Sequence, residues 1–452
     1  MRSMLVILIL LGLVPGAGAQ TPATDDDRAP SSPGAFWAAA GDPTLGRLIE
    51  VALERNPDLR AVDARVDVAR ADRLAATLDL APAVTARGGY TRQQMSGASF
   101  PGLGGSLPEQ DLWEAGVQLS WELDAFGRVR RSLQGRSALL DATEEEVDDT
   151  RLLLAAEVAD AYFRFRGEEN RLAVARRNAE NQRRTLTVTR ERLDGGRGTA
   201  LDTERASAQL SSTLAIISGL EASMTAARLR LASLIGGDPA PMLETPAAPF
   251  ELPALAADAA SPRPEELVRQ RPDLRGAEQR LAASEAFVGA ARADYLPRIS
   301  VQGAAGYTAG AFDDLGRSGT PRYAFGPVIS WPLLDLGRVK ARVDGARAEQ
   351  AEARARYDAA VLRAVEEVGT SRVAYSSALE RLRHLEDAAT ASERATELAR
   401  LRFEEGATDF LEVLDAERRQ LEAQDRLATG RTEAANALVA LYRATGGEGW
   451  SP

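Results

Sequence analysis

The chain has 452 residues, a formal net charge of −11 and 27% charged residues. With 44% hydrophobic residues, it is typical neither of a disordered chain nor of a helical membrane protein throughout. The negative charge argues against nucleic-acid binding, which needs clustered positive charge. The sequence holds no Cys and a single His, His384, for which we expect a solvated or packing role. This excludes disulfides, thiolate metal sites, a lipidated N-terminal Cys and most zinc or His-based catalytic sites.

Residues 1–19 are typical of a secretory signal peptide. Arg2 supplies the positive region, residues 5–14 form a short apolar core, and residues 17–19 form a small-residue cleavage site. The alternative is a membrane anchor, but the apolar run is shorter than the roughly 20 residues that a helical span needs. We therefore expect cleavage before Gln20 and export from the cytoplasm.

The positions of the prolines divide the rest of the chain. No proline lies between Pro108 and Pro239, or between Pro332 and Pro452, so two spans of more than a hundred residues are free to be helical. Residues 239–272 hold eight prolines, which indicates a linker.

The two proline-free spans are related copies. An offset of 210 aligns SWELDAFGRVR, from Ser120, with SWPLLDLGRVK, from Ser330. Upstream, an offset of 215 aligns NPDLR, from Asn56, with RPDLR, from Arg271. We expect the five-residue difference to fall in a loop at residues 97–109, because loops tolerate changes of length.

The signal peptide, the prolines and the duplication together divide the chain into six consecutive segments. They are a signal peptide (1–19), an N-terminal segment (20–44), a first repeat (45–237), a Pro-rich linker (238–264), a second repeat (265–447) and a C-terminal tail (448–452).

Each repeat is expected to open with an Ala/Arg-rich amphipathic helix, over residues 45–80 and 265–295, that ends just before a proline. A strand hairpin then follows, over about 84–121 and about 299–331, because apolar and polar residues alternate there with a period of two. Pro327 lies within the last of these runs and indicates a bulge or an irregular strand end.

A sheet with one apolar face fits either a soluble sandwich or a membrane barrel. Export and strand-like runs of about nine residues favour the barrel. So do large aromatic residues near the strand ends, namely Tyr90, Trp113, Trp121, Tyr307 and Trp331. Four strands cannot close a barrel, since the smallest membrane barrels have about eight, so several chains would have to share one.

Each repeat is expected to close with a long antiparallel helical hairpin, over about 126–235 and about 336–445. Its first helix in the first repeat would be roughly 100 Å long at 1.5 Å per residue. Short turns at residues 194–198 and 405–407 separate the outgoing and returning helices.

In combination, these features resemble the outer-membrane factors of bacterial tripartite efflux pumps, the TolC/OprM group, and within it the NodT-like branch. The resemblance covers nearly the whole mature chain. Besides the two strand-to-helix junctions, it is carried by FWAAAGDPTLGRLIEVALERNPDLRAVDARV, RPDLRGAEQRLAASEAFVGAARADYLPRIS and RFEEGATDFLEVLDAERRQL.

The resemblance implies a mainly α-helical homotrimer with a shared 12-stranded outer-membrane β-barrel above a periplasmic α-helical tunnel. The linker and terminal segments would form an equatorial collar. Such a protein is a passive exit duct for small molecules, which works with a periplasmic adaptor (membrane fusion) protein and an inner-membrane pump. It is not an enzyme and needs no cofactor. Many members of this branch carry a lipid on an N-terminal Cys, so this chain would be anchored by its barrel alone.

The helical turns are the first candidate site. The resemblance places them at the periplasmic end of the tunnel, where the adaptor docks, and the candidate residues are Gly195, Gly196, Arg197, Gly406 and Ala407. Alternatively, the glycines serve only to reverse the chain between helices.

Acidic residues just past the turns are the second candidate site. Asp415 and Glu412 match acids that ring the tunnel mouth in the family, and Asp202 is a third candidate. Crowded carboxylates would attract cations and raise some pKa values. Asp415 aligns with Arg205 of the first repeat, so the ring would come mainly from the second repeat.

A capping role is the alternative for two of these acids. Thr199-x-x-Asp202 and Asp409-x-x-Glu412 both fit a capping pattern at a helix start. Asp415 has no such role and is the stronger gate candidate.

The chain departs from well-known members at the closed mouth. Where they have a locking Tyr and Arg, this chain has Phe403 and Thr408. Any lock must use other contacts, for which Arg205, Arg402 and Arg418 are available.

A periplasmic coiled-coil adaptor or scaffold with a small soluble β domain is the alternative function. It predicts a water-soluble protein once the signal peptide is removed, whereas the duct predicts a detergent-requiring trimer.

Overall fold

The computed structural model describes residues 33–39, 41–95, 108–243 and 264–447. Four expected segments lie wholly or partly outside the described residues: the signal peptide (1–19), residues 20–32 and 40 of the N-terminal segment, residues 244–263 of the linker, and the tail (448–452). Most of the loop expected to hold the five-residue difference, residues 96–107, also lies outside them.

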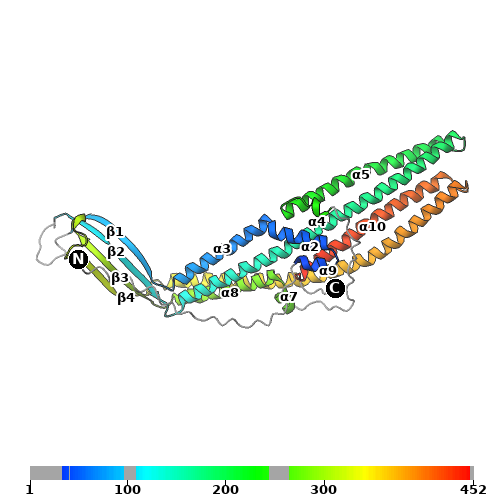
Figure 1. The fold of residues 1–452 in the computed structure, drawn as a ribbon. Helices are drawn as coiled ribbons and strands as arrows, with labels where there is room; N and C mark the ends of the chain where they lie inside the picture. The colour runs from blue at the N-terminus through cyan, green and yellow to red at the C-terminus, as the bar shows by residue number, and fades with distance from the viewer. Residues whose placement is uncertain (1–32, 40, 96–107, 244–263, 448–452) are drawn as a thin grey trace. The chain divides into compact units, whose positions relative to one another are not determined.

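Helices dominate the described chain, and four strands form one sheet (Figure 1), which confirms the mainly α-helical fold with a small sheet. In chain order the elements are α1 (Pro33–Ala39), α2 (Pro43–Arg55), α3 (Pro57–Leu78), β1 (Ala83–Gln93), β2 (Gln110–Leu123), α4 (Arg128–Asp194), α5 (Ala200–Ile235), α6 (Ala240–Leu243), α7 (Pro264–Gln270), α8 (Pro272–Ala293), β3 (Arg298–Ala309), η2 (Phe312–Asp314), β4 (Pro321–Ser330), α9 (Leu336–Glu404) and α10 (Phe410–Ala444).

The two halves of the chain contain equivalent elements in the same order. Helices α3 and α8 begin at Pro57 and Pro272, an offset of 215, whereas α4 and α9 end at Asp194 and Glu404, an offset of 210. The change of offset therefore falls between these pairs of helices, in the part of each repeat that holds the strand hairpin.

The single helices expected over residues 45–80 and 265–295 are wrong. Each is broken once, into α2 and α3 in the first repeat and into α7 and α8 in the second. The break lies at Asn56 and at Arg271, where ψ is 126° and 119°. Both residues precede a proline, whose ring pushes the preceding residue out of the helical region.

The two breaks carry an equivalent hydrogen bond made by different side chains. Asn56 Nδ2 donates to the carbonyl of Leu234 at 2.9 Å, and Arg271 Nη1 donates to the carbonyl of Ala444 at 3.0 Å. Leu234 and Ala444 are related by the 210 offset. A hydrogen bond therefore connects the start of α3 to the end of α5 in the first repeat, and the start of α8 to the end of α10 in the second. Asn56 also caps α3 by accepting from the N–H of Leu59 at 3.2 Å.

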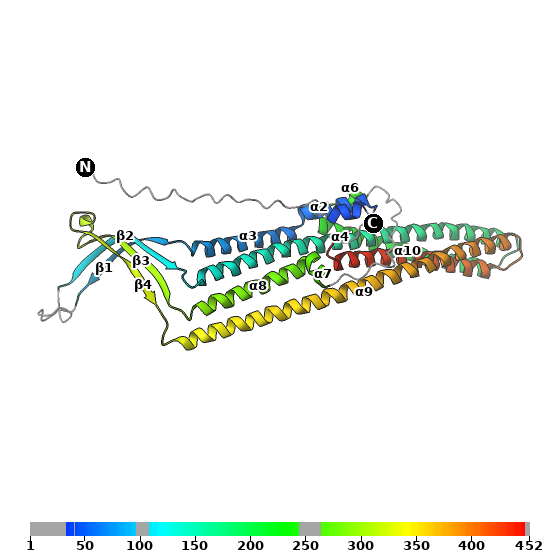
Figure 2. The same ribbon diagram turned by 90° about the horizontal axis from the view of Figure 1, so that it is seen from below.

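The sheet is antiparallel throughout, with the strand order β1-β2-β3-β4. The two hairpins are joined by pairing of β2 with β3, so the sheet crosses the boundary between the repeats. Strands β1 and β4 are its two edges. Strands β1 and β3 follow α3 and α8, whereas β2 and β4 lead into α4 and α9, so the strand order β1 to β4 is matched by the helices α3, α4, α8 and α9 (Figure 2).

One face of this sheet is apolar across all four strands. The register places Val84, Val117, Val301 and Ile329 on the same face, with their neighbours at every second position. The members of this face include the exposed side chains of Tyr90, Tyr307, Tyr323 and Phe325. The opposite face carries mainly polar or small residues, because strand side chains alternate.

Pro327 does not produce the bulge or irregular end that the sequence indicates. The pairing of β3 with β4 runs without interruption from Arg298↔Ser330 to Tyr307↔Pro321, with Val301 opposite Pro327. Within the chain β4 pairs on one side only, so a missing N–H donor removes at most one hydrogen bond and the ladder with β3 continues through it.

Two tryptophans connect the sheet to the helices. Trp121 Nε1 donates to the carbonyl of Leu80 at 2.9 Å, and Trp331 Nε1 donates to the carbonyl of Tyr295 at 3.0 Å. Each indole thus bonds a carbonyl just past the end of α3 or α8. These aromatic residues have a structural role at the junction between sheet and helices.

The largest hydrophobic core lies where the N-terminal helices pack on the long helices. Trp37 of α1 is fully buried, with ring centroids 5.8 Å from Phe163 of α4 and 5.4 Å from Tyr442 of α10. This core holds α1 and α2 against both repeats. None of the described helices combines the length and the apolar character that crossing a membrane requires.

A titratable group lies where α4 meets α8. The pKa of Asp149 on α4 is raised to about 6, first by burial and next by the nearby Asp273, against the opposing effect of Arg271. Since this pKa exceeds the ordinary value of 3.8 for an aspartate, the contribution of Asp149 to stability is present at low pH and is lost as the pH rises through about 6.

We expect Asp149→Asn to raise the apparent melting temperature at pH 7.5 by roughly 2–5 °C, because the ionised carboxylate is removed from its half-buried position. The difference should shrink below pH 4.5, where the wild-type carboxyl is protonated. Thermal unfolding monitored by circular dichroism between pH 4 and 8 measures this. Asp148→Asn is the matched control, because Asp148 is exposed and pairs with Arg151 at 2.9 Å. An unchanged pH profile in Asp149→Asn would contradict the assignment.

Candidate functional site at the helical turns

The turns between the paired helices have the same backbone geometry in both repeats. Gly196 and Gly406 have φ of +69° and +72°, in the left-handed region that favours glycine. The N–H of Arg197 donates to the carbonyl of Arg192 at 2.8 Å, and the N–H of Ala407 donates to the carbonyl of Arg402 at 2.8 Å. These bonds close the last turn of α4 and of α9.

The five docking candidates, Gly195, Gly196, Arg197, Gly406 and Ala407, are all exposed at these two turns. Chain reversal alone explains the glycine at Gly196 and Gly406. It does not explain Gly195, whose φ of −79° is open to other residues. Docking at this surface stays a prediction.

Both returning helices begin with a side-chain cap, made by Thr199 in α5 and by Asp409 in α10. Thr199 Oγ1 accepts from the N–H of Asp202 at 3.2 Å and lies 2.7 Å from Asp202 Oδ2. Asp409 Oδ1 accepts from the N–H of Glu412 at 3.2 Å. The carboxylate of Asp202 is thus part of its cap. The carboxylate of Glu412 instead faces Arg402, 3.7 Å away.

Asp415 has two arginine partners on its own helix. Its carboxylate lies 2.8 Å from Arg418 Nη2 and 2.8 Å from Arg419 Nε. The hydrogen bond from Arg418 holds the pKa of Asp415 below its ordinary value, with a further contribution from Arg419. Within one chain Asp415 is therefore a stabilised anion, and the crowding that would raise pKa values requires other copies.

The three arginines that were available to hold the mouth closed each form an ion pair with an acid of the same chain. Arg418 bonds Asp415, Arg402 faces Glu412, and Arg205 lies 3.9 Å from Asp202. All three gate candidates thus belong to local ion pairs at the starts of α5 and α10.

The two turns are joined by a contact that the sequence does not predict. Arg192 Nη2 donates to the carbonyls of Phe403 and Glu404, at 2.8 Å and 3.1 Å. Its guanidinium also lies 4.0 Å from the centroid of the Phe403 ring. A cation suits the carbonyl end of a helix. Arg192 aligns with Arg402 under the 210 offset. This alignment is the only feature of the sequence noted here that points to Arg192.

A polar seam between α4 and α10 continues from this contact. Glu417 is 2% exposed, and its Oε1 accepts from Thr185 at 2.7 Å and from Arg400 Nη2 at 2.8 Å. Further along, Asn178 Nδ2 donates to Gln424 Oε1 at 2.9 Å. A buried carboxylate is costly without partners, so Glu417 fixes the position of the second hairpin against the first.

We expect Arg192→Ala to loosen both turns without unfolding the chain. Losing about 1 kcal/mol of local stability raises the population of open states about fivefold. Hydrogen exchange followed by mass spectrometry should therefore show faster exchange at residues 403–407 and 192–198. Arg190→Ala, an exposed arginine on the same helix, is the control. Equal protection in Arg192→Ala and wild type would show that the contact has no such role.

Comparison with known proteins is consistent with this geometry. The family model described as outer membrane efflux protein matches residues 48–237 and 264–447. The outer membrane protein OprJ of Pseudomonas aeruginosa is 32% identical, over 90% of this chain and 85% of its own. Nodulation protein T of Rhizobium leguminosarum bv. trifolii is 30% identical, over 92% of this chain and 88% of its own.

A solved structure, that of the outer-membrane channel OprN, is similar over 94% of both chains, with 40% identity and a TM-score of 0.83. The family model covers both repeats, and each relative is matched over most of its length. The chain therefore belongs to the outer membrane efflux protein family.

Proposed function

We propose that this protein is the outer-membrane exit duct of a tripartite efflux or secretion system, and that it passively conducts small molecules to the exterior. Three copies would share one 12-stranded barrel above a helical tunnel in the periplasm. The observation that supports this most directly is the apolar face of the four-stranded sheet.

An exposed apolar face of this size needs an apolar environment. Tyr323, Phe325 and Ile329 are 88%, 75% and 69% exposed in the single chain. Contiguous exposed apolar surface marks a membrane or protein contact. The polar face opposite it would line a water-filled lumen, as in membrane barrels.

The sheet edges support sharing among copies. Strands β1 and β4 pair on one side only within the chain. In lipid the other side must also be hydrogen-bonded, and a closed barrel achieves this. Pairing β4 of one copy with β1 of the next, three times, gives twelve strands.

The remaining parts follow from this arrangement. Residues 1–19 would be removed on export, and without a Cys the barrel alone would anchor the chain. Residues 20–44 and 238–264 would form the equatorial collar. The exposed turns at Gly195, Gly196, Arg197, Gly406 and Ala407 would meet a periplasmic adaptor, which connects the duct to an inner-membrane pump.

Cell fractionation tests the proposal. We expect the protein in the outer-membrane fraction, soluble only in detergent, as a trimer that dissociates on heating in SDS. Light scattering in detergent measures the mass of the complex. Recovery as a water-soluble periplasmic monomer would exclude the duct and favour the adaptor or scaffold.

The acids past the turns would form a cation-attracting gate in the trimer. Three copies bring Asp415 and Glu412 together near one axis, with Asp202 beside them. In the first repeat the position that aligns with Asp415 holds Arg205, so this repeat has a base where the second has an acid.

In planar bilayers, we expect Asp415→Ala to lower cation selectivity and to weaken block by multivalent cations, because three carboxylates are lost from the mouth. Arg205→Asp should act in the opposite direction, since it adds three. Reversal potentials in a salt gradient measure both. Selectivity that changes in neither variant would remove Asp415 from the gate.

A further inference from the structure

The polar face of the four-stranded sheet carries several charged side chains, and all but one of them belong to ion pairs. They are Arg87 on β1, Glu114 and Glu122 on β2, Arg298 on β3 and Arg322 on β4. Glu122 bonds Arg128 at 2.7 Å, and Arg298 bonds Asp294 at 2.6 Å. Arg322 Nη2 lies 3.0 Å from Glu114 Oε1. Among the strand residues that the structure describes, Arg87 is thus the charge on this face that has no ion-pair partner.

Two glycines allow Arg322 to reach its acid. Arg322 lies on β4 and Glu114 on β2, so their ion pair crosses β3. Gly306 of β3 is directly opposite Arg322 and has no side chain in the way. Across the ladder from Gly306 is Gly116, where a Cβ would lie 2.5 Å from the carbonyl oxygen of Ala305. That distance is too short for any side chain, so the middle of this row stays bare.

Arg87 stands at the other end of the same row. The register pairs Arg87 with Gly116, so the row across the four strands reads Arg, Gly, Gly, Arg. Its neighbours along β1 on this face are Thr85 and Gly89, and neither carries a charge. The acid one diagonal step away is Glu114, which is already paired with β4. The exposed guanidinium of Arg87 is therefore available to a ligand.

A neighbouring copy would not neutralise Arg87 either. In the proposed barrel, β4 of the next copy lies along the open side of β1. The polar face of β4 holds no acid, since its members are Arg322, Ala324, Gly326, Val328 and Ser330. This holds in whichever register the two strands meet. Each copy would then contribute two arginines and one acid to this part of the wall, which leaves a net positive charge.

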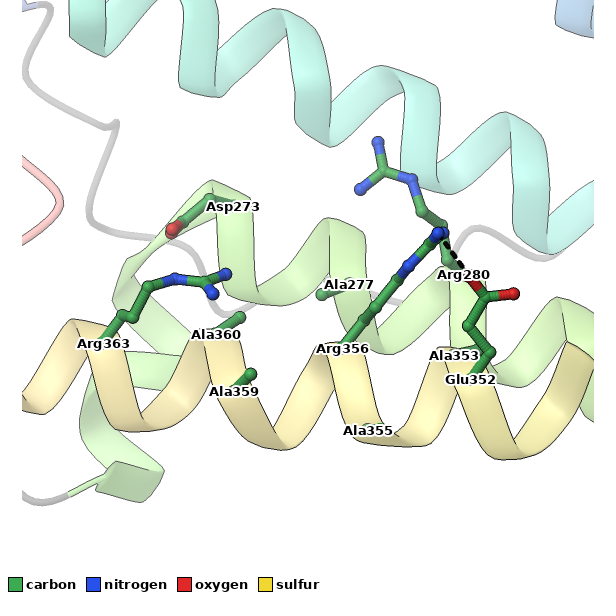
Figure 3. Close-up of a pocket in the computed structure, with 10 residues that line it drawn as sticks. All are labelled: Asp273, Ala277, Arg280, Glu352, Ala353, Ala355, Arg356, Ala359, Ala360 and Arg363. Atoms are coloured by element: carbon green, nitrogen blue, oxygen red, sulfur yellow. Dashed lines mark hydrogen bonds and ion pairs between the residues drawn. The ribbon is translucent and has the colours of Figure 1, made fainter.

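The slot between α8 and α9, of about 760 Å³, provides a contrast (Figure 3). Its charged lining consists of Arg280, Arg356, Arg363, Asp273 and Glu352. Arg356 bonds Glu352, and Arg280 bonds Glu146 of α4. Acids within the same chain therefore nearly balance the arginines of the slot, whereas Arg87 on the sheet is not balanced.

We propose that Arg87 makes the lumen of the barrel attract anions, with one such site in each of the three copies. The favoured cargo is then a small molecule that carries a carboxylate, sulfonate or phosphate group. A guanidinium presents a planar fork of donors that fits such groups. A charged wall with a low-dielectric layer behind it also concentrates ions of opposite sign. This inference rests on the proposed function, because it needs the polar face to line a water-filled lumen.

Charged thiol reagents measure the potential beside Arg87, because the sequence has no cysteine. Gln118 is exposed on the polar face, one diagonal step from Arg87. Full-length Gln118→Cys in outer-membrane vesicles is treated with an anionic (sulfonate) or a cationic (trimethylammonium) methanethiosulfonate. Mass spectrometry of the adducts gives the two rates. Their ratio reports the local potential, since a change in the thiolate fraction affects both rates equally.

Arg87→Gln should lower the ratio of the anionic to the cationic rate about fourfold at about 10 mM salt, for one charge roughly 8 Å away. The difference should disappear at about 1 M salt, where charges act over only about 3 Å. Arg87→Lys keeps the charge and should retain the ratio. The matched control is Arg92→Gln, because Arg92 lies on the same strand but on the opposite face, paired with Glu109. It should leave the ratio unchanged.

Val117→Cys, on the apolar face, separates the two ways in which the idea could fail. It should stay protected by lipid while Gln118→Cys reacts. If that holds but Arg87→Gln leaves the ratio unchanged, the inference alone is overturned. If Val117→Cys reacts as fast as Gln118→Cys, or if Gln118→Cys does not react, the polar face lines no lumen, and the proposed function fails together with the inference.

Discussion

The constraint on which this structure depends is the unsatisfied backbone at the edges of a four-stranded sheet whose one face is apolar. Strands β1 and β4 each lack a partner on one side within the chain. An apolar face with open edges is stable neither in water, where it aggregates, nor in lipid, where each unpaired amide costs several kcal/mol. Copies of the chain that closed the ring would satisfy both requirements. The edge strands are joined to α3 and α9, so the same closure would determine which helices meet below the sheet.

The duplication keeps positions while it changes chemistry. Asn56 and Arg271 make the same bond to equivalent carbonyls, yet Asn56 can also cap a helix and Arg271 cannot. Arg271 instead forms ion pairs with Asp273 and Glu367, at 2.9 Å and 2.8 Å. The same contact is therefore built from different residues in the two repeats.

Much of this was accessible from the sequence, because offsets, prolines and alternation are local signals. They predict the two repeats, the strand hairpins and the long helices. The break at Asn56 was missed because the amphipathic pattern continues through it, although the following proline was visible. Pro327 was misjudged because the effect of one missing N–H donor depends on how the neighbouring strand pairs, which is a property of the whole sheet. At the candidate site, the caps of Thr199 and Asp409 were readable from spacing. The bond from Arg192 to Phe403 was not, because it joins residues 211 positions apart.

The contact of Arg192 also bears on how the mouth could be held without the family's tyrosine and arginine. Arg192 and Arg402 occupy equivalent positions at the ends of α4 and α9. The first reaches across to the other hairpin, whereas the second faces Glu412 of its own. Phe403 takes part through its carbonyl and its ring, neither of which needs the hydroxyl of a tyrosine. In a ring of six hairpins, Arg192 would thus fasten the seam between the two hairpins of each chain, by contacts that depend on neither the tyrosine nor the arginine of other members.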